Sequence, residues 1–222
     1  MITIKPTGGV CNYLRVVFSW YQHAKHLNLE LNVIWIKTKW CPGHFLDYFE
    51  PIKNINFIND VEEGCKINYH GCKCHPGYHQ NRNYIYGELK LKPSLQKIVD
   101  DKLELLNKNY ISVHIRRTDH LNYQLRKNVH TDDEQFINFI NNSDDNKNIY
   151  IATDNKGTYN NFKSKYPERI KFDYHETDNN SYRKTSLQDA IIDIYMCVYS
   201  DDFMGTNCSS FSDLIHKLKN AH

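Results

Sequence analysis

Residues 113–119 read VHIRRTD and combine one imidazole, two guanidinium groups and a carboxylate. Side chains alternate along a strand, so His114 and Arg116 would share one face. Both faces of a buried parallel sheet are usually apolar, so polar groups at the carboxyl end of a strand are typical of ligand sites in open α/β sheets. Arginine offers a rigid fork of donors for a diphosphate, and histidine can bind a base or a ribose. The simpler interpretation is that an arginine pairs with Asp119 or Asp154 and fastens the strand end.

Two further segments place hydroxyl and carboxylate groups after predicted strands. Residues 206–210 (TNCSS) precede the last predicted helix, where hydroxyls and backbone N–H groups can receive an anion. Plain capping by Asn207 or Ser209 explains the same residues. Thr153 and Asp154 end another predicted strand. Because all these groups follow strands in one half of the chain, they would meet at the ligand-binding edge of one sheet.

Gly8 and Gly9 follow the first predicted strand, where glycine allows a ligand to approach the backbone or simply makes a tight turn. The flanking residues form neither a G-x-G-x-x-G fingerprint nor a P-loop. Dinucleotide or ATP binding of those kinds is therefore disfavoured.

Residues 65–79 hold six candidate metal ligands, namely Cys65, His70, Cys72, Cys74, His75 and His79. Zinc accepts thiolate and imidazole ligands. However, the C-x-C step lacks the usual zinc-knuckle spacing, and no second pair follows at a finger-like distance. A loop with incidental cysteines and histidines is favoured, and a zinc-dependent interaction protein is the less favoured alternative.

The elements that would position these groups are clearest in the second half of the chain. Hydrophobic spacing predicts strands at 110–115, 149–153, 170–172 and 203–204 and helices at 93–106, 132–141, 156–166, 187–199 and 209–218. In the first half it predicts strands at 2–5 and 31–36, a helix at 12–27 and an irregular segment at 60–83. This alternation predicts an α/β fold with parallel sheets of the doubly wound kind, divided into residues 1–90 and 91–222.

Composition narrows the class of protein. The chain has 222 residues, 40% of them hydrophobic and 24% charged, which suits one large or two small globular domains. A net charge of +2 provides no broad field for nucleic acid or an acidic membrane. No apolar run of about 18 residues predicts a membrane span. The N-terminus does not have the pattern of a signal peptide, and the seven cysteines are scattered, so we expect a cytoplasmic protein without a disulfide framework.

The string VHIRRTD resembles the nucleotide-sugar motif of fucosyltransferases of the α-1,2, α-1,6 and protein-O-fucosyl type. It is most similar to the α-1,6 group, which includes the bacterial nodulation enzymes. Residues 191–195 and 201–210 resemble the family's I-x-D-I…A-D-F…T-x-S-S segment. Residues 8–15 (GGVCNYLR) resemble its G-G-L-G-N-x-L-R start. The three motifs occur in the family's order and extend over nearly the whole chain.

The resemblance implies a GT-B-like architecture, with two Rossmann-like halves facing a cleft. Residues 1–90 would form the acceptor-side half, and residues 91–222 would hold the nucleotide sugar. The implied activity is inverting transfer of fucose from GDP-fucose, or from another GDP-sugar, to a glycan acceptor. The family uses no metal and no other cofactor. The alternative is a catalytically degenerate module that binds a GDP-sugar or a glycan on the same fold.

Carried over by position, three residues would act in catalysis. Arg116 would bind the β-phosphate and offset its charge as GDP leaves, and Asn12 would approach the transferred sugar from the other half. Asp119 is the candidate base, because residues 120–124 lack the Lys and Glu that the α-1,6 enzymes place there.

The remaining candidates would bind the donor. Asp193 would pair with the guanine edge, His114 would contact the guanosine, and hydroxyls before the last helix would donate to phosphate. The full set of donor-binding candidates is Gly8, Gly9, His114, Arg117, Asp154, Asp193, Thr206, Ser209 and Ser210.

Overall fold

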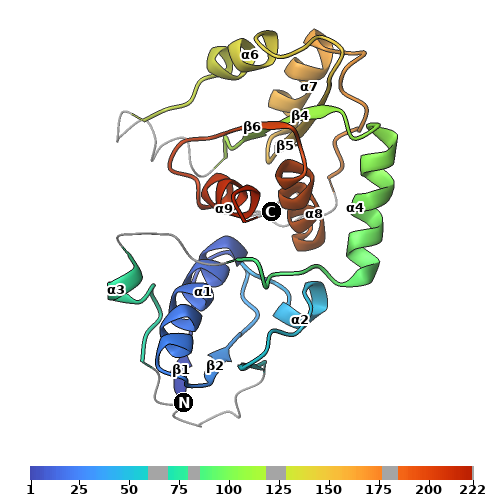
Figure 1. Ribbon diagram of the computed structural model, residues 1–222. Coiled ribbons are helices and arrows are strands. Elements are labelled where there is room, and N and C mark those ends of the chain that lie inside the picture. Colours follow the sequence, from blue (N-terminus) through green and yellow to red (C-terminus); the bar gives the residue numbers. More distant parts are fainter. Residues whose placement is uncertain (60–69, 80–85, 119–128, 177–184, 222) are drawn as a thin grey trace. The chain divides into compact units, whose positions relative to one another are not determined.

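The computed structural model describes residues 1–59, 70–79, 86–118, 129–176 and 185–221 (Figure 1). The chain forms two compact units, Met1–Pro93 with Asn220–His222 and Ser94–Lys219. In the described residues, each unit contains one three-stranded parallel sheet. The prediction of an α/β fold with parallel sheets is confirmed. The facing cleft and the roles assigned to the two halves stay predictions.

In the first unit the sheet order is β1 (Ile2–Ile4), β2 (Leu31–Ile34), β3 (Ile55–Ile58). The long helix α1 (Val10–His26) buries one side, because apolar residues recur at helical spacing from Val10 to Ala24. The short helices α2 (Phe45–Tyr48) and α3 (Pro76–His79) complete the described part of this unit. A single parallel bridge from Ile4 to Gly71 brings the segment after residue 69 alongside β1.

In the second unit the sheet order is β5 (Asn148–Thr153), β4 (Tyr110–Ile115), β6 (Asp202–Gly205). The described residues of this unit also form the helices α4 (Pro93–Leu105), α6 (Asp133–Asn141), α7 (Lys156–Lys165), α8 (Leu187–Val198) and α9 (Ser210–Lys219). Figure 1 shows α6 and α7 on one face of this sheet and α8 and α9 on the other.

The central strand β4 is buried along its whole length. Ile111, Val113 and Ile115 pack into a core with side chains of α6 and α7. The alternate side chains face α8 and α9: the Tyr110 hydroxyl donates to the carbonyl of Met196 at 2.5 Å. This alternation brings His114 to the α8 and α9 face, as the strand pattern predicts.

Local sequence explains where the helices of this unit begin. The side chains of Asp132, Asn155 and Ser186 accept hydrogen bonds from backbone N–H groups in the first turns of α6, α7 and α8. Each therefore offsets a donor that the helix itself leaves unpaired.

The described elements differ from the predicted ones in two places. The predicted strand at 170–172 is reduced to a single bridge between Ile170 and Ile149. The strand β3 was not predicted, because its apolar residues alternate with asparagines that also suit a turn. None of the helices in the described ranges is long and apolar enough to cross a membrane.

Candidate functional site

The end of β4 is tied to the end of β6 through the buried hydroxyl of Thr206. This hydroxyl accepts from the backbone N–H of Arg116 at 2.9 Å and donates to the carbonyl of His114 at 2.9 Å. The backbone N–H of Thr206 donates to the same carbonyl at 3.0 Å. Thr206 therefore holds the backbone of Arg116 beside the end of β6.

The side chain of Asp154, just after β5, accepts hydrogen bonds from Arg117 and Thr118. Its Oδ1 accepts from the backbone N–H of Arg117 at 2.9 Å, and its Oδ2 accepts from the hydroxyl of Thr118 at 2.5 Å. The guanidinium Nε of Arg116 lies 4.0 Å from Oδ2, and the Arg116 side chain is 34% exposed. The ion pair between an arginine and Asp154 that the sequence allowed is therefore present for Arg116. Its N–O distance is long, and about a third of the Arg116 side chain is exposed to solvent.

The side chain of Arg117 is held by α6 and its approach. Nη1 donates to the carbonyl of Thr131 at 2.8 Å, Nη2 donates to the Asp133 carboxylate, and the guanidinium lies 5.8 Å from the centre of the Phe136 ring. Its side chain is only 12% exposed. The structure therefore separates two adjacent arginines that the sequence could not distinguish.

The start of α9 holds a buried hydroxyl with unused hydrogen-bonding capacity. Ser209 is 4% exposed, and its Oγ has no hydrogen-bond partner among the described residues. Its backbone N–H points to the carbonyl of Thr206 at 3.4 Å. Ser210 follows as the first residue of α9. A helix N-terminus with a buried hydroxyl that no described residue satisfies is suited to an anion.

Gly205 allows α9 to approach β6 closely. A Cβ at this position would lie 2.5 Å from both the Cβ and the Oγ of Ser212. That hydroxyl lies 2.7 Å from Nδ1 of His114, whose ring stacks on Phe211 with centroids 4.3 Å apart. His114 is 5% exposed. The imidazole is thus fixed within the α9 packing, directly before the end of β4.

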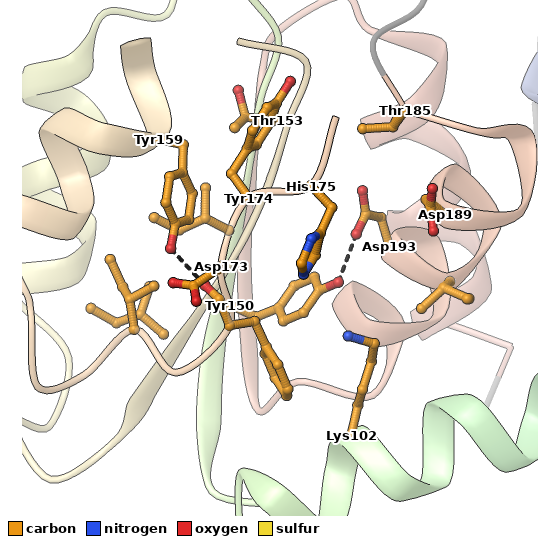
Figure 2. A pocket seen from close by; sticks show the side chains of 15 residues that line it. Lys102, Tyr150, Thr153, Tyr159, Asp173, Tyr174, His175, Thr185, Asp189 and Asp193 are labelled. Carbon is orange, nitrogen blue, oxygen red and sulfur yellow. Dashed lines mark hydrogen bonds between the residues drawn. The ribbon is translucent and has the colours of Figure 1, made fainter. Parts of the chain in front are cut away.

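A second cluster of polar side chains, which includes Tyr150 and Asp193, lies beside β5 (Figure 2). The Tyr150 hydroxyl of β5 donates to Oδ1 of Asp193 on α8 at 2.6 Å. The pKa of Asp193 is raised to about 7, mainly because the carboxyl is buried; nearby Asp189 also raises it, whereas the Tyr150 hydrogen bond and Lys102 oppose the rise. This carboxyl therefore titrates near neutral pH.

These groups line a pocket of about 90 Å³ beside β5. Both Tyr150 and Thr153 of β5 line it. Because a strand rises about 10 Å over three residues, the pocket extends along β5 by about that length. Phe172, Tyr174 and Lys102 of α4 also line the pocket. The Tyr174 hydroxyl is buried without a hydrogen-bond partner in the described part of the chain.

Gly8, Gly9 and Asn12 belong to the first unit. Gly8 has φ +100°, which disfavours any residue with a Cβ. Gly9 is the N-cap of α1 and provides no side-chain hydrogen bond, while Oδ1 of Asn12 accepts from Arg15. The backbone N–H groups at the start of α1 therefore lack a side-chain cap.

Some sequence candidates fall outside the description. Asp119, the candidate base, and Cys65 lie outside the described residues, and the side chain of His79 is also undescribed. Where side chains are described, no group of three or more His, Cys, Asp or Glu could hold a metal ion. His70 and His75 lie against Trp20 of α1.

Sequence analysis did not single out Tyr150 or Lys102. Tyr150 is a polar-tipped residue inside a strand whose neighbours are apolar, and this was an available signal. Lys102 lies in an amphipathic helix rich in charge, where nothing distinguishes it from other surface lysines.

The family comparison agrees with this geometry. Residues 15–222 match the family model described as GDP-fucose protein O-fucosyltransferase. The chain belongs to this family. The resemblance to fucosyltransferases and the prediction of a glycosyltransferase are thereby confirmed.

Solved structures of fucosyltransferases share the fold at low sequence identity. The NodZ α-1,6-fucosyltransferase soaked with GDP-fucose matches with a TM-score of 0.67 and 14% identity, over 98% of this chain and 92% of that one. NodZ from Bradyrhizobium matches with a TM-score of 0.66 and 14% identity, over 95% and 90%. POFUT1 in complex with GDP-fucose matches with a TM-score of 0.67 and 12% identity, over 100% and 95%. No curated protein sequence matches the chain.

Proposed function

We propose that this member of the GDP-fucose protein O-fucosyltransferase family transfers fucose from GDP-fucose to a hydroxyl of a glycan acceptor, with inversion at the anomeric carbon. The observation that carries the proposal is the juxtaposition of Arg116 and Ser209 on either side of Thr206. Thr206 binds the backbone N–H of Arg116 through its hydroxyl and that of Ser209 through its carbonyl. A guanidinium and a helix N-terminus with an unsatisfied hydroxyl are thus held beside one residue, and both suit a diphosphate.

The proposed reaction is a single displacement. An oxygen of the acceptor forms a bond to the anomeric carbon while the bond from that carbon to the β-phosphate oxygen breaks and GDP leaves. The acceptor hydroxyl gives its proton to a general base, for which Asp119 stays the proposed residue. Arg116 and the start of α9 would offset the charge that develops on the β-phosphate, so the proposal assigns no step to a metal or to another cofactor.

The rest of the donor would lie along the second unit. Asp193 would accept from the guanine edge, and Ser210 and Thr206 would add contacts near the phosphates. His114 and Arg117, whose side chains bind Ser212 and the Thr131 carbonyl, would lie beside the donor and fix the positions of the groups that contact it. Gly8, Gly9 and Asn12 of the first unit would approach the diphosphate and the sugar.

The test is calorimetric titration with GDP, GDP-fucose, GDP-mannose and UDP, each with and without EDTA. The proposal expects tight binding of the guanosine ligands, weaker binding of UDP and no effect of EDTA. Absence of binding by both GDP and GDP-fucose would overturn it. GDP binding without transfer and without hydrolysis of GDP-fucose would instead indicate a degenerate binding module.

A variant pair tests the role of Arg116. Arg116→Ala should lower turnover by about 10²–10³-fold, as loss of a preorganised charge-stabilising donor does. Arg116→Lys keeps the charge but loses the fork, so it should recover only part of the activity. Thermal unfolding of both variants checks that the fold is intact. Wild-type turnover in a folded Arg116→Ala protein would show that this residue is structural.

A further inference from the structure

We propose that Lys102 of α4 donates a hydrogen bond to O6 of the guanine base, and that Lys102 and Asp193 together select guanine within the pocket beside β5. This inference rests on the proposed function, because it assumes that the donor is a guanosine nucleotide. It adds a specificity residue from a helix in which the sequence shows no motif.

An acidic and a basic side chain lie together in the pocket, which suits a base whose edge carries both hydrogen-bond donors and an acceptor. Guanine presents N–H donors at N1 and N2 and an acceptor at O6, on one continuous edge. The carboxylate of Asp193 and the ammonium of Lys102 both line the pocket and interact electrostatically. Lys102 acts on Asp193 through its charge, whereas the side-chain hydrogen bond that Asp193 makes among the described residues comes from Tyr150, so a ligand edge can lie between the two charged groups.

Each group is held by a neighbour. The Tyr150 hydroxyl fixes Oδ1 of Asp193 at 2.6 Å, and a carboxylate has enough acceptor sites left to receive two N–H groups of a base. The ammonium of Lys102 lies 4.2 Å from the centre of the Phe172 ring. This contact orients the lysine at the pocket wall and costs little hydration.

The walls suit the faces of a purine. Phe172 packs edge-on against Tyr150 with ring centroids 5.8 Å apart, and Tyr174 adds a third aromatic ring to the lining of the pocket. The buried Tyr174 hydroxyl, which has no partner in the described part of the chain, shows that the pocket holds polar capacity that the protein itself does not use. Thr153, just before Asp154, connects this pocket with the end of β5 where Arg116 lies.

The arrangement also rejects adenine. Adenine carries an amino group where guanine has O6, and it has no proton on N1. Its amino group would face the Lys102 ammonium, and its N1 lone pair would face the Asp193 carboxylate, so both contacts would be repulsive.

The experiment is a ligand–variant cycle by calorimetry on the full chain. The ligands are GDP, 6-thio-GDP, in which sulfur replaces O6, and IDP, which lacks the 2-amino group. The variants are Lys102→Met and, as a matched control on the exposed side of the same helix, Lys97→Met. Lys97 pairs with Asp101 at 3.0 Å and is 75% exposed.

The wild type and Lys97→Met should bind GDP more tightly than 6-thio-GDP, because sulfur is the weaker acceptor. Lys102→Met should lose about tenfold in GDP affinity, the effect of one charge-assisted hydrogen bond, and should bind GDP and 6-thio-GDP alike. It should keep the preference for GDP over IDP, which reports on Asp193.

Three outcomes would count against the inference. If Lys102→Met still discriminates between GDP and 6-thio-GDP, Lys102 does not contact O6. If it loses affinity equally for all three ligands while the thio preference is retained, its role is only electrostatic. If the wild type binds none of the ligands, the proposed function itself fails. Should Lys102→Met not fold, Lys102→Leu, which also removes the donor, gives the same comparison.

Discussion

Single side chains in this protein serve both the fold and the site. Thr206 satisfies the backbone N–H of Arg116 with the same hydroxyl that closes β4 onto β6. Ser209 lies three residues later, yet its buried hydroxyl has no partner in the described residues. Because an unsatisfied buried hydroxyl costs about 1–3 kcal/mol, the start of α9 is less stable without a ligand than it would be with one.

Asp193 gives a prediction about pH. Its carboxyl has a pKa of about 7, above the usual value, because it is buried near Asp189 on α8, while Tyr150 on β5 and Lys102 on α4 lower it. If the carboxylate accepts from guanine, GDP affinity should fall as pH decreases from 8 to 6 and the carboxyl becomes protonated. Calorimetry at several pH values measures this dependence.

The matched variant is Asp193→Asn. At pH 8 it should bind GDP more weakly than the wild type does, and its GDP affinity should not depend on pH between 6 and 8. The folded state raises the pKa of this acid from 3.8 to about 7, so the folded state binds more protons than the unfolded state between these values and stability falls as pH rises through them. Asp193→Asn should therefore unfold at a higher temperature than the wild type at pH 8. GDP binding in the wild type that is constant from pH 6 to 8 would refute the role of the carboxylate.

At the scale of elements, histidine side chains join the segment after residue 69 to α1 and β1. The rings of His75 and His23 stack with centroids 3.9 Å apart. Burial lowers the pKa of His75, and His23 lowers it further. Nδ1 of His75 accepts from the backbone N–H of Gly77 at 3.1 Å, which requires an unprotonated nitrogen.

Acidification should therefore loosen this segment. The folded pKa of His75 lies below its unfolded value of about 6.5, so the unfolded state binds more protons and stability is lost as pH falls through that region. The hydrogen-exchange protection of the Lys5 amide, which donates to the Gly71 carbonyl at 3.0 Å, should decrease between pH 7 and pH 5.5 once the slower intrinsic exchange at lower pH is corrected for. His23→Gln removes the like charge and should reduce this loss of protection, whereas an equal loss in both proteins would exclude the His75–His23 pair as its cause.

Elements with a strong pattern could be predicted from sequence. β4 was predicted because its residues are suited to burial on both faces, and the polar residues directly after it indicated the ligand edge. The partners of those residues could not be predicted. The Tyr150–Asp193 hydrogen bond joins residues 43 apart in the chain, and only the packing of α8 on β5 brings them together. Likewise, only the position of α6 shows that Arg117, and not Arg116, is held by Asp133.

At the scale of the whole molecule, the proposed function divides the donor between two units. The second unit provides the groups around Thr206 and the pocket beside β5. In this proposal the first unit would contribute the start of α1, where the Gly9 N-cap leaves backbone donors without a side-chain cap. A nucleotide without its sugar should therefore affect mainly the second unit, and the intact donor should affect both.

Hydrogen exchange with GDP and with GDP-fucose tests this division. GDP should slow exchange at the end of β4, at the start of α9 and along β5, because ligand contacts stabilise those backbone groups. GDP-fucose should add protection at residues 8–13, and Asn12→Ala should remove this additional protection while keeping that of the second unit. Equal protection of residues 8–13 by both ligands would mean that the first unit contacts the nucleotide. Protection confined to the second unit with the intact donor would mean that this end of α1 has no part in holding the sugar.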